Sequence, residues 1–253
     1  MTSMLLDPIM ADTIAVAPGY LSLCELVADK IAVLVQSKPN AVLGLATGST
    51  PLGVYQQLVH LHQHHGLDFS RVTCFNLDEY FPMTADSSHS YHHFMQENLF
   101  QHINCVHWFV PDGRPRSETE IAQDCRDYEA RIADAGGIDL QLLGIGRTGH
   151  IGFNEPGSSP DSRTRLVTLA AETRLDAASS FGGLAHVPTL AVSMGIGTIL
   201  EAREIVLMAS GAGKAAIVHS AWTSEASVDM PASWVRRHPN AHLCLDKSAA
   251  SYF

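Results

Sequence analysis

Residues 142–158 read LLGIGRTGHIGFNEPGS and constrain the fold more than any other stretch of the chain. The apolar run 138–143 leads into them and predicts a buried strand. The glycines that follow have the G-x-G-x-x-G spacing of a dinucleotide-binding turn, which opens a helix. Here Pro156 and two further glycines stand where that helix would run, and both residue types break helix interiors. We therefore reject a nicotinamide site and predict a glycine-rich loop at the carboxyl end of a strand, where ligands bind in open α/β sheets.

This loop carries His150 and Glu155, five residues apart. Single polar residues on a loop are usually solvated surface groups. A glutamate that orients an imidazole can instead tune it for acid/base work near neutral pH. The position of the pair directly after a buried strand favours a functional site.

The rest of the chain alternates between apolar strand-like runs and amphipathic helical stretches. Strands are predicted at 41–46, 72–76, 138–143, 165–169, 190–193, 204–210 and 241–246, and helices at 20–36, 51–62, 90–100, 118–133, 171–181, 197–202 and 213–222. Such alternation is typical of a mostly parallel sheet covered by helices on both faces. No linker, repeat or low-complexity segment interrupts it, so we expect one domain over residues 1–253.

Composition excludes several classes of protein. The formal net charge of −10 disfavours a nucleic-acid surface, which needs a basic patch. No apolar stretch is long enough to span a membrane, and the first residues lack the basic leader and cleavage site of a signal peptide. The five cysteines are odd in number and form no C-x-x-C pair, which predicts reduced thiols in a cytoplasmic protein. His60 and His64 have i, i+4 spacing but no acidic or cysteine neighbour, so we expect a polar helix end and no metal site.

The segment Thr47-Gly48-Ser49-Thr50-Pro51 joins a predicted strand to a predicted helix, with Thr50 as the expected N-cap. Gly48 lets the backbone approach a ligand closely, and the helix N-terminus presents free N–H groups to an anion. Because the P-loop lysine is missing, a single sugar phosphate fits better than a nucleoside triphosphate. An ordinary capped helix start remains the alternative.

Two further positions could carry chemistry. Asp78 and Glu79 follow the strand 72–76, where they form either a surface turn or a general base over the same crevice. Lys214 lies in a glycine-rich turn at the start of a helix, where the helix dipole is unfavourable to a cation. A bound phosphate would relieve that effect; an exposed lysine is the alternative.

Four motifs in order carry a family resemblance: LGLATGSTPLGVY, FNLDEY, GHIGFNEPGS and SMGIGTIL…ASGAGKAAIV. They span residues 41–246 and resemble the motifs of glucosamine-6-phosphate deaminases, in the glucosamine/galactosamine-6-phosphate isomerase family. The resemblance implies a Rossmann-like α/β fold. It also implies conversion of glucosamine 6-phosphate and water to fructose 6-phosphate and ammonia, in amino-sugar catabolism, without metal or organic cofactor. The partner is a small sugar phosphate; a homo-oligomer is left open.

The resemblance assigns roles to residues of this chain. His150, oriented by Glu155, would open the sugar ring, and Asp78 would move a proton from C2 to C1. The expected substrate-binding residues are Thr47, Gly48, Ser49, Thr50, Gly146 and Lys214.

The chain departs from the family pattern in three places. Thr148 stands where many relatives carry an Asp two residues before the loop His, and a hydroxyl orients an imidazole without stabilising an imidazolium. A phosphate-binding Arg of some relatives falls on Ser179, for which Arg174 is a candidate substitute. A Lys of the activator site of hexameric relatives falls on Val167, so we expect no activation by N-acetylglucosamine 6-phosphate.

The alternatives are a galactosamine-6-phosphate deaminase/isomerase and, more remotely, a 6-phosphogluconolactonase, both on the same scaffold. A catalytically weak sugar-phosphate sensor is the alternative from another class. A sensor would need the phosphate loops but not Asp78, His150 and Glu155, whose presence argues against it.

Overall fold

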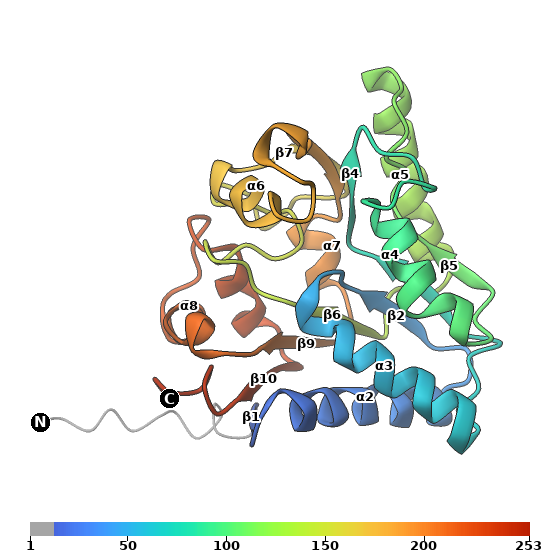
Figure 1. The fold of residues 1–253 in the computed structure, drawn as a ribbon, viewed down its shortest axis with the longest axis vertical. Helices are drawn as coiled ribbons and strands as arrows, with labels where there is room; N and C mark the ends of the chain where they lie inside the picture. Colours follow the sequence, from blue (N-terminus) through green and yellow to red (C-terminus); the bar gives the residue numbers. More distant parts are fainter. Residues whose placement is uncertain (1–12) are drawn as a thin grey trace, which may run out of the picture.

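The computed structural model describes residues 13–253 and is built on a parallel sheet of seven strands (Figure 1). The strand order is β1-β10-β9-β6-β2-β3-β5, and every neighbouring pair is parallel. The strands are β1 (Ile14–Ala17), β2 (Val42–Leu45), β3 (Thr73–Asn76), β5 (His107–Phe109), β6 (Leu140–Leu143), β9 (Glu204–Ala209) and β10 (Ala241–Asp246). This confirms the predicted α/β class, and β1 and β5 add two strands that the sequence did not predict.

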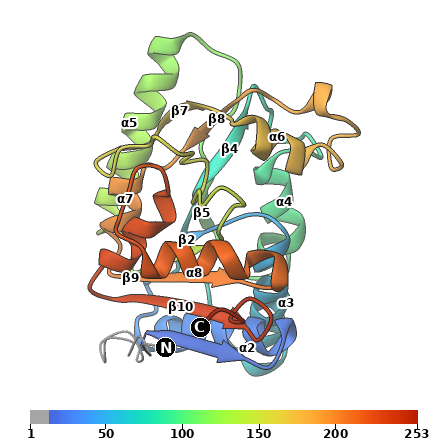
Figure 2. The same cartoon turned by 90° about the vertical axis from the view of Figure 1, so that its left-hand side faces the viewer.

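Helices cover both faces of this sheet (Figures 1 and 2). Those packed on one face are α2 (Tyr20–Ser37), α3 (Ser49–His65) and α4 (Tyr91–Asn98). Those on the other are α5 (Glu118–Asp134), α7 (Ile196–Leu200) and α8 (Ala215–Thr223). No helix within residues 13–253 is both long and apolar enough to cross a membrane.

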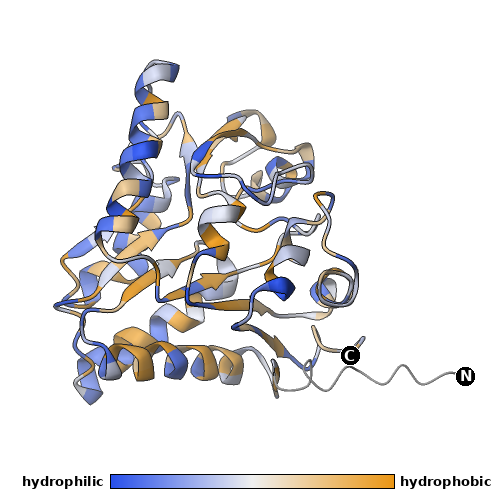
Figure 3. Cartoon of the chain, turned by 180° about the vertical axis from the view of Figure 1, so that it is seen from behind, coloured by the Kyte–Doolittle hydropathy of each residue, from blue (hydrophilic) through white to orange (hydrophobic). Residues whose placement is uncertain are grey.

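The hydrophobic pattern explains this layering. Leu23, Val27, Ile31 and Val35 recur every four residues along α2, and all are buried against the sheet. The central strands contribute apolar residues to a core on each face, because helices cover both faces, and much of their length is coloured as hydrophobic in Figure 3. Parallel strands place all their carboxyl ends at one edge, and the loops that leave that edge build the site.

A second, antiparallel sheet stands beyond that edge. Its order is β4-β8-β7, with β4 (Asp78–Phe81), β8 (Leu190–Ser193) and β7 (Arg165–Thr168). The strands predicted near 165 and 190 therefore lie in this small sheet, outside the parallel one. A parallel neighbour requires a crossover helix that packs on the main sheet. The short helix α6 (Ala171–Ala177) instead packs with its flanking residues on the small sheet.

Candidate active site

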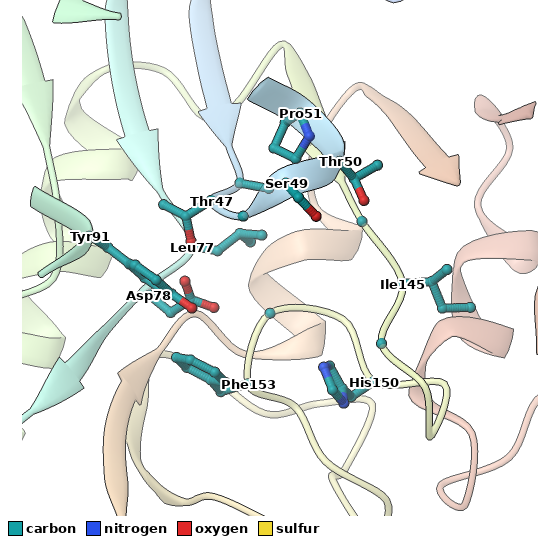
Figure 4. Close-up of a pocket in the computed structure, with 15 residues that line it drawn as sticks. Thr47, Ser49, Thr50, Pro51, Leu77, Asp78, Tyr91, Ile145, His150 and Phe153 are labelled. Carbon is teal, nitrogen blue, oxygen red and sulfur yellow. The ribbon is translucent and has the colours of Figure 1, made fainter. Parts of the chain in front are cut away.

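A cavity opens at the carboxyl ends of β2, β3 and β6 (Figure 4). Its volume is about 210 Å³, below the ~300–1,000 Å³ of drug-sized ligand sites, which suits a small ligand. It is lined by Ala46, Thr47, Gly48, Ser49, Thr50, Pro51, Leu77, Asp78, Tyr91, Gly144, Ile145, Gly146, His150, Gly152 and Phe153. The structure thus brings the three loops singled out in the sequence to one place.

The loop after β2 forms one wall of the cavity with Thr47, Gly48, Ser49 and Thr50. Helix α3 begins at Ser49, and its N-cap is Gly48, not Thr50 as predicted. The φ of 109° at Gly48 explains this, because that backbone conformation favours glycine. The first N–H groups of α3 have no acceptor within the helix, and the residues that carry them line the cavity. These groups and the hydroxyls of Ser49 and Thr50 suit a phosphate.

Asp78 lies in the cavity wall beside Thr47 (Figure 4). It is the first residue of β4, directly beyond the end of β3, and only 5% of it is exposed. Burial raises the pKa of its carboxyl group to about 8, and the neighbouring charge of Glu79 adds to the effect. A buried carboxyl group with a pKa in this range is typical of a proton-transfer residue.

Glu79 points to the other side of β4, as the alternation of a strand requires. Its carboxylate accepts the backbone N–H groups of Tyr91 and His92 at 2.9 and 3.0 Å, at the first turn of α4. Burial raises its pKa to about 7, against the lowering effect of these hydrogen bonds. Glu79 therefore fixes the start of α4, which places Tyr91 in the cavity wall, stacked on Phe153 with ring centroids 5.8 Å apart.

His150 faces Asp78 across the cavity (Figure 4). Its Nδ1 lies 3.0 Å from Thr148 Oγ1 and 3.3 Å from Glu155 Oε2. The ring packs directly on the Cα of Gly146, where any side chain would overlap it. With Nδ1 turned to the loop, Nε2 is free to exchange a proton with a ligand.

The second carboxylate oxygen of Glu155, Oε1, accepts two hydrogen bonds from another segment. Oε1 accepts the hydroxyl of Thr173 at 2.5 Å and the backbone N–H of Ala170 at 3.2 Å. Burial alone would raise the pKa of Glu155, but the hydrogen bonds with His150 and Thr173 outweigh it and leave the pKa below its usual value. Glu155 thus lies beside the imidazole with its pKa held below the usual value, which favours the carboxylate.

Lys214 and Arg174, the two cations considered for the phosphate, lie in different places. The ammonium group of Lys214 donates at 2.8 Å to the carbonyl of Ile145, which lines the cavity, but Lys214 is not itself among the lining residues. Burial lowers the pKa of Lys214, with a smaller effect from Arg147. Arg174 donates to the carbonyls of Leu184 and Val187 and lines a separate cavity.

Asn154 holds the loop to the small antiparallel sheet. Its side-chain amide donates to the carbonyls of Ile151 and Met194 at 2.9 and 2.8 Å and accepts from Arg165 at 2.9 Å. Arg165 also donates to Ser158 at 3.2 Å, so both residues are engaged within the loop.

Sequence reasoning missed Tyr91, Phe153, Ser193 and Thr173. Ser193 Oγ accepts the backbone N–H of Phe153 at 3.1 Å and so ties the loop to β8. An aromatic residue or a hydroxyl on a separate element gives no local signal of its place, because only the fold brings it to the site. The arrangement as a whole offers a buried carboxyl group and an oriented imidazole on facing walls, beside an anion-binding loop. This suits proton transfers on a small phosphorylated substrate.

The chain is similar to several known proteins. The family model described as "Glucosamine-6-phosphate isomerases/6-phosphogluconolactonase" matches residues 20–244. A glucosamine-6-phosphate deaminase of Colwellia psychrerythraea is 50% identical over 229 residues, covering 90% of this chain and 85% of that protein. Glucosamine-6-phosphate deaminase 2 of Bacillus subtilis is 47% identical over 241 residues, covering 94% of this chain and 96% of that protein.

Solved structures extend the comparison. One described as a monomeric glucosamine-6-phosphate deaminase superposes with a TM-score of 0.92 at 42% identity, covering 95% of this chain and all of that chain. A 6-phosphogluconolactonase of Trypanosoma brucei has a TM-score of 0.75 at 21% identity, covering 95% of this chain and 98% of that chain. The latter likeness shows a shared fold.

Proposed function

The chain belongs to the family of glucosamine-6-phosphate isomerases and 6-phosphogluconolactonases, and we propose that it is the deaminase: it converts glucosamine 6-phosphate and water to fructose 6-phosphate and ammonia. The observation that carries the proposal is the placement of Asp78 and His150 on facing walls of one cavity that also contains the Ser49–Thr50 helix start. A deaminase needs both proton-transfer groups, whereas a phosphate sensor needs only the loop.

His150 performs the first step. With its Nδ1 side held by Thr148 and Glu155, Nε2 moves a proton from the anomeric hydroxyl toward the ring oxygen, and the pyranose opens. The open chain carries an aldehyde at C1 and the amino group at C2.

Asp78 performs the second step. It removes the proton from C2 to give an enolamine and returns the proton to C1, which leaves an imine at C2. Water adds to the imine and ammonia leaves, giving the ketone. The C2 ammonium group of the bound substrate would favour the ionised carboxylate, because an opposite charge within about 4–6 Å lowers the pKa of a carboxyl group.

The remaining predicted residues bind the phosphate in this proposal. The first N–H groups of α3 and the hydroxyls of Thr47, Ser49 and Thr50 receive it, Gly48 and Gly146 keep the approach open, and Lys214 supplies a positive charge from behind the loop.

A coupled assay that records ammonia and fructose 6-phosphate tests the proposal. Equal amounts of both products from glucosamine 6-phosphate are expected. Products from galactosamine 6-phosphate alone would indicate the epimer-specific enzyme, and hydrolysis of 6-phosphogluconolactone alone would indicate the lactonase. Binding of the sugar phosphate without turnover would indicate a sensor and contradict the proposal.

We propose a cytoplasmic location, in keeping with an amino-sugar phosphate as substrate and with five unpaired cysteines. We also propose a homo-oligomer as one possible state of the protein; the alternative is a monomer, as the solved relative is described. Light scattering on the purified protein distinguishes the two states.

A further inference from the structure

We infer that Thr173 is a positioning residue for the acid/base group His150, acting through the carboxylate of Glu155. The inference rests on the proposed function for its kinetic part only. Thr173 lies in the first turn of α6, 18 residues beyond Glu155 and outside the four motifs of the family resemblance. It does not touch the cavity.

The contacts of Glu155 carry the argument. Both donors from the α6 segment, the Thr173 hydroxyl at 2.5 Å and the Ala170 N–H at 3.2 Å, reach the same oxygen, Oε1. Oε2 is left to face Nδ1 of His150 at 3.3 Å and has no other hydrogen-bond partner among residues 13–253. A carboxylate pinned at one oxygen presents the other in a fixed direction.

The direction of Glu155 Oε2 matters because it decides which ring nitrogen of His150 carries the proton. Thr148 is uncharged and its hydroxyl can either donate to or accept from Nδ1, so by itself it does not decide which ring nitrogen holds the proton. A carboxylate only accepts, and Glu155 therefore selects the form with the proton on Nδ1. That form leaves the lone pair of Nε2 toward the cavity, as ring opening requires. Releasing Glu155 would let Thr148 donate to Nδ1 and move the proton to Nε2.

The burial of Thr173 supports its role in positioning the carboxylate of Glu155. Only 7% of the residue is exposed, and the hydroxyl donates to an anion, an interaction stronger than one between neutral groups. Replacing it with Val keeps the shape and removes the donor, while Ser keeps the donor and removes a methyl group.

The experiment compares three variants in steady-state kinetics. Thr173→Val should lower kcat for glucosamine 6-phosphate about tenfold, with KM within about twofold of the wild type, because a hydrogen bond to a charged group is lost away from the substrate. Thr173→Ser should restore most of kcat. The matched control is Thr198→Val in α7, which removes a hydroxyl that donates at 2.7 Å to another partly buried carboxylate, Glu129, a residue that does not line the cavity. It should leave kcat unchanged.

A second readout needs no turnover. Nitrogen NMR of histidine-labelled, substrate-free protein reports whether Nδ1 or Nε2 of His150 is protonated, with its signals identified by their loss in His150→Asn. The Nδ1-protonated form should predominate in the wild type and in Thr173→Ser and decline in Thr173→Val.

Three outcomes would overturn the inference. One is a Thr173→Val variant with the kcat and the His150 signals of the wild type. The others are a loss of kcat as large as that of Thr173→Val in Thr173→Ser, or in Thr198→Val, where it would indicate general destabilisation. If the wild type proves inactive, the proposed function fails, and the nitrogen signals alone still decide the role of Thr173.

Discussion

Replacing Asp78 with Asn should abolish most turnover and, at alkaline pH, make the folded protein more stable. Asp78 is almost fully buried, and burial together with Glu79 raises the pKa of its carboxyl group to about 8. A group held at such a pKa resists ionisation, so the folded state loses stability relative to the unfolded chain once the pH is high enough for an unfolded Asp to ionise. The amide of Asn has the same shape and no charge.

The magnitude follows from the two pKa values. An Asp in the unfolded chain ionises near 3.9, about four pH units below Asp78 in the folded state, and each unit corresponds to about 1.4 kcal/mol, so ionised Asp78 costs on the order of 5 kcal/mol. Because the folded pKa is the higher one, this cost is absent below about pH 4 and grows as the pH rises through 8. The buried NH₂ group of Asn would lack a hydrogen-bond acceptor, which costs about 1–3 kcal/mol of stability at every pH. The variant should therefore gain about 2–4 kcal/mol in free energy of unfolding at pH 8, and lose about 1–3 kcal/mol near pH 4.

Urea unfolding at pH 5, 6, 7 and 8 measures this difference. The matched control is Asp246→Asn, because hydrogen bonds from Ser210, Ala249 and Gly211 outweigh burial and lower the pKa of Asp246. That variant should be less stable than the wild type at pH 8. If the curves of the Asp78 variant and the wild type ran parallel across this range, the reasoning about the buried carboxyl group would be refuted. Turnover at pH 8 should fall by about 10²–10⁴, the usual contribution of a positioned acid/base group.

Three other variants or ligands test the site. Lys214→Ala should weaken binding of glucosamine 6-phosphate by roughly 1.5–3 kcal/mol but hardly affect glucosamine; an equal loss for both, measured by calorimetry, would remove Lys214 from the phosphate site. Gly146→Ala should lower kcat strongly while the protein stays folded by circular dichroism, because a Cβ would displace the His150 ring; full activity would contradict the packing of that ring. N-acetylglucosamine 6-phosphate should leave a hyperbolic substrate curve in place, since Val167 cannot supply the cation of the activator site; a sigmoidal curve made hyperbolic by this ligand would contradict that view.

The sequence predicted the central sheet well because its strands are short apolar runs between amphipathic helices, and that pattern depends on local residues alone. The glycine-rich loop after β6 was also predictable, since Pro156 excludes the helix of a dinucleotide site. His150 and Glu155 were found because they share that loop.

Other features depend on distant parts of the chain. The sequence of β4, DEYF, begins with two acids and reads as a turn; it is a strand because Leu190–Ser193 pairs with it. Gly48 replaces Thr50 as the N-cap because its backbone conformation, which the sequence does not reveal, starts α3 earlier. Thr173 gives no signal at all, since its role depends on an oxygen of Glu155 that only the folded chain brings near.

The small antiparallel sheet limits how the length of this chain can vary. Asp78 lies opposite Ser193, and Asp78 and Glu79 face opposite sides of β4 because side chains alternate along a strand. One residue inserted or deleted before Asp78 in this pairing would turn both side chains to the opposite faces of β4, so that Glu79 faces the cavity side and Asp78 the side of α4. Substitutions in β4 and β8 change side chains one at a time, but a change of length there turns Asp78 away from the cavity and Glu79 away from the start of α4 in a single step. Changes of length in evolution must therefore fall in the connections, such as residues 82–90, whose ends the sheet does not hold in register.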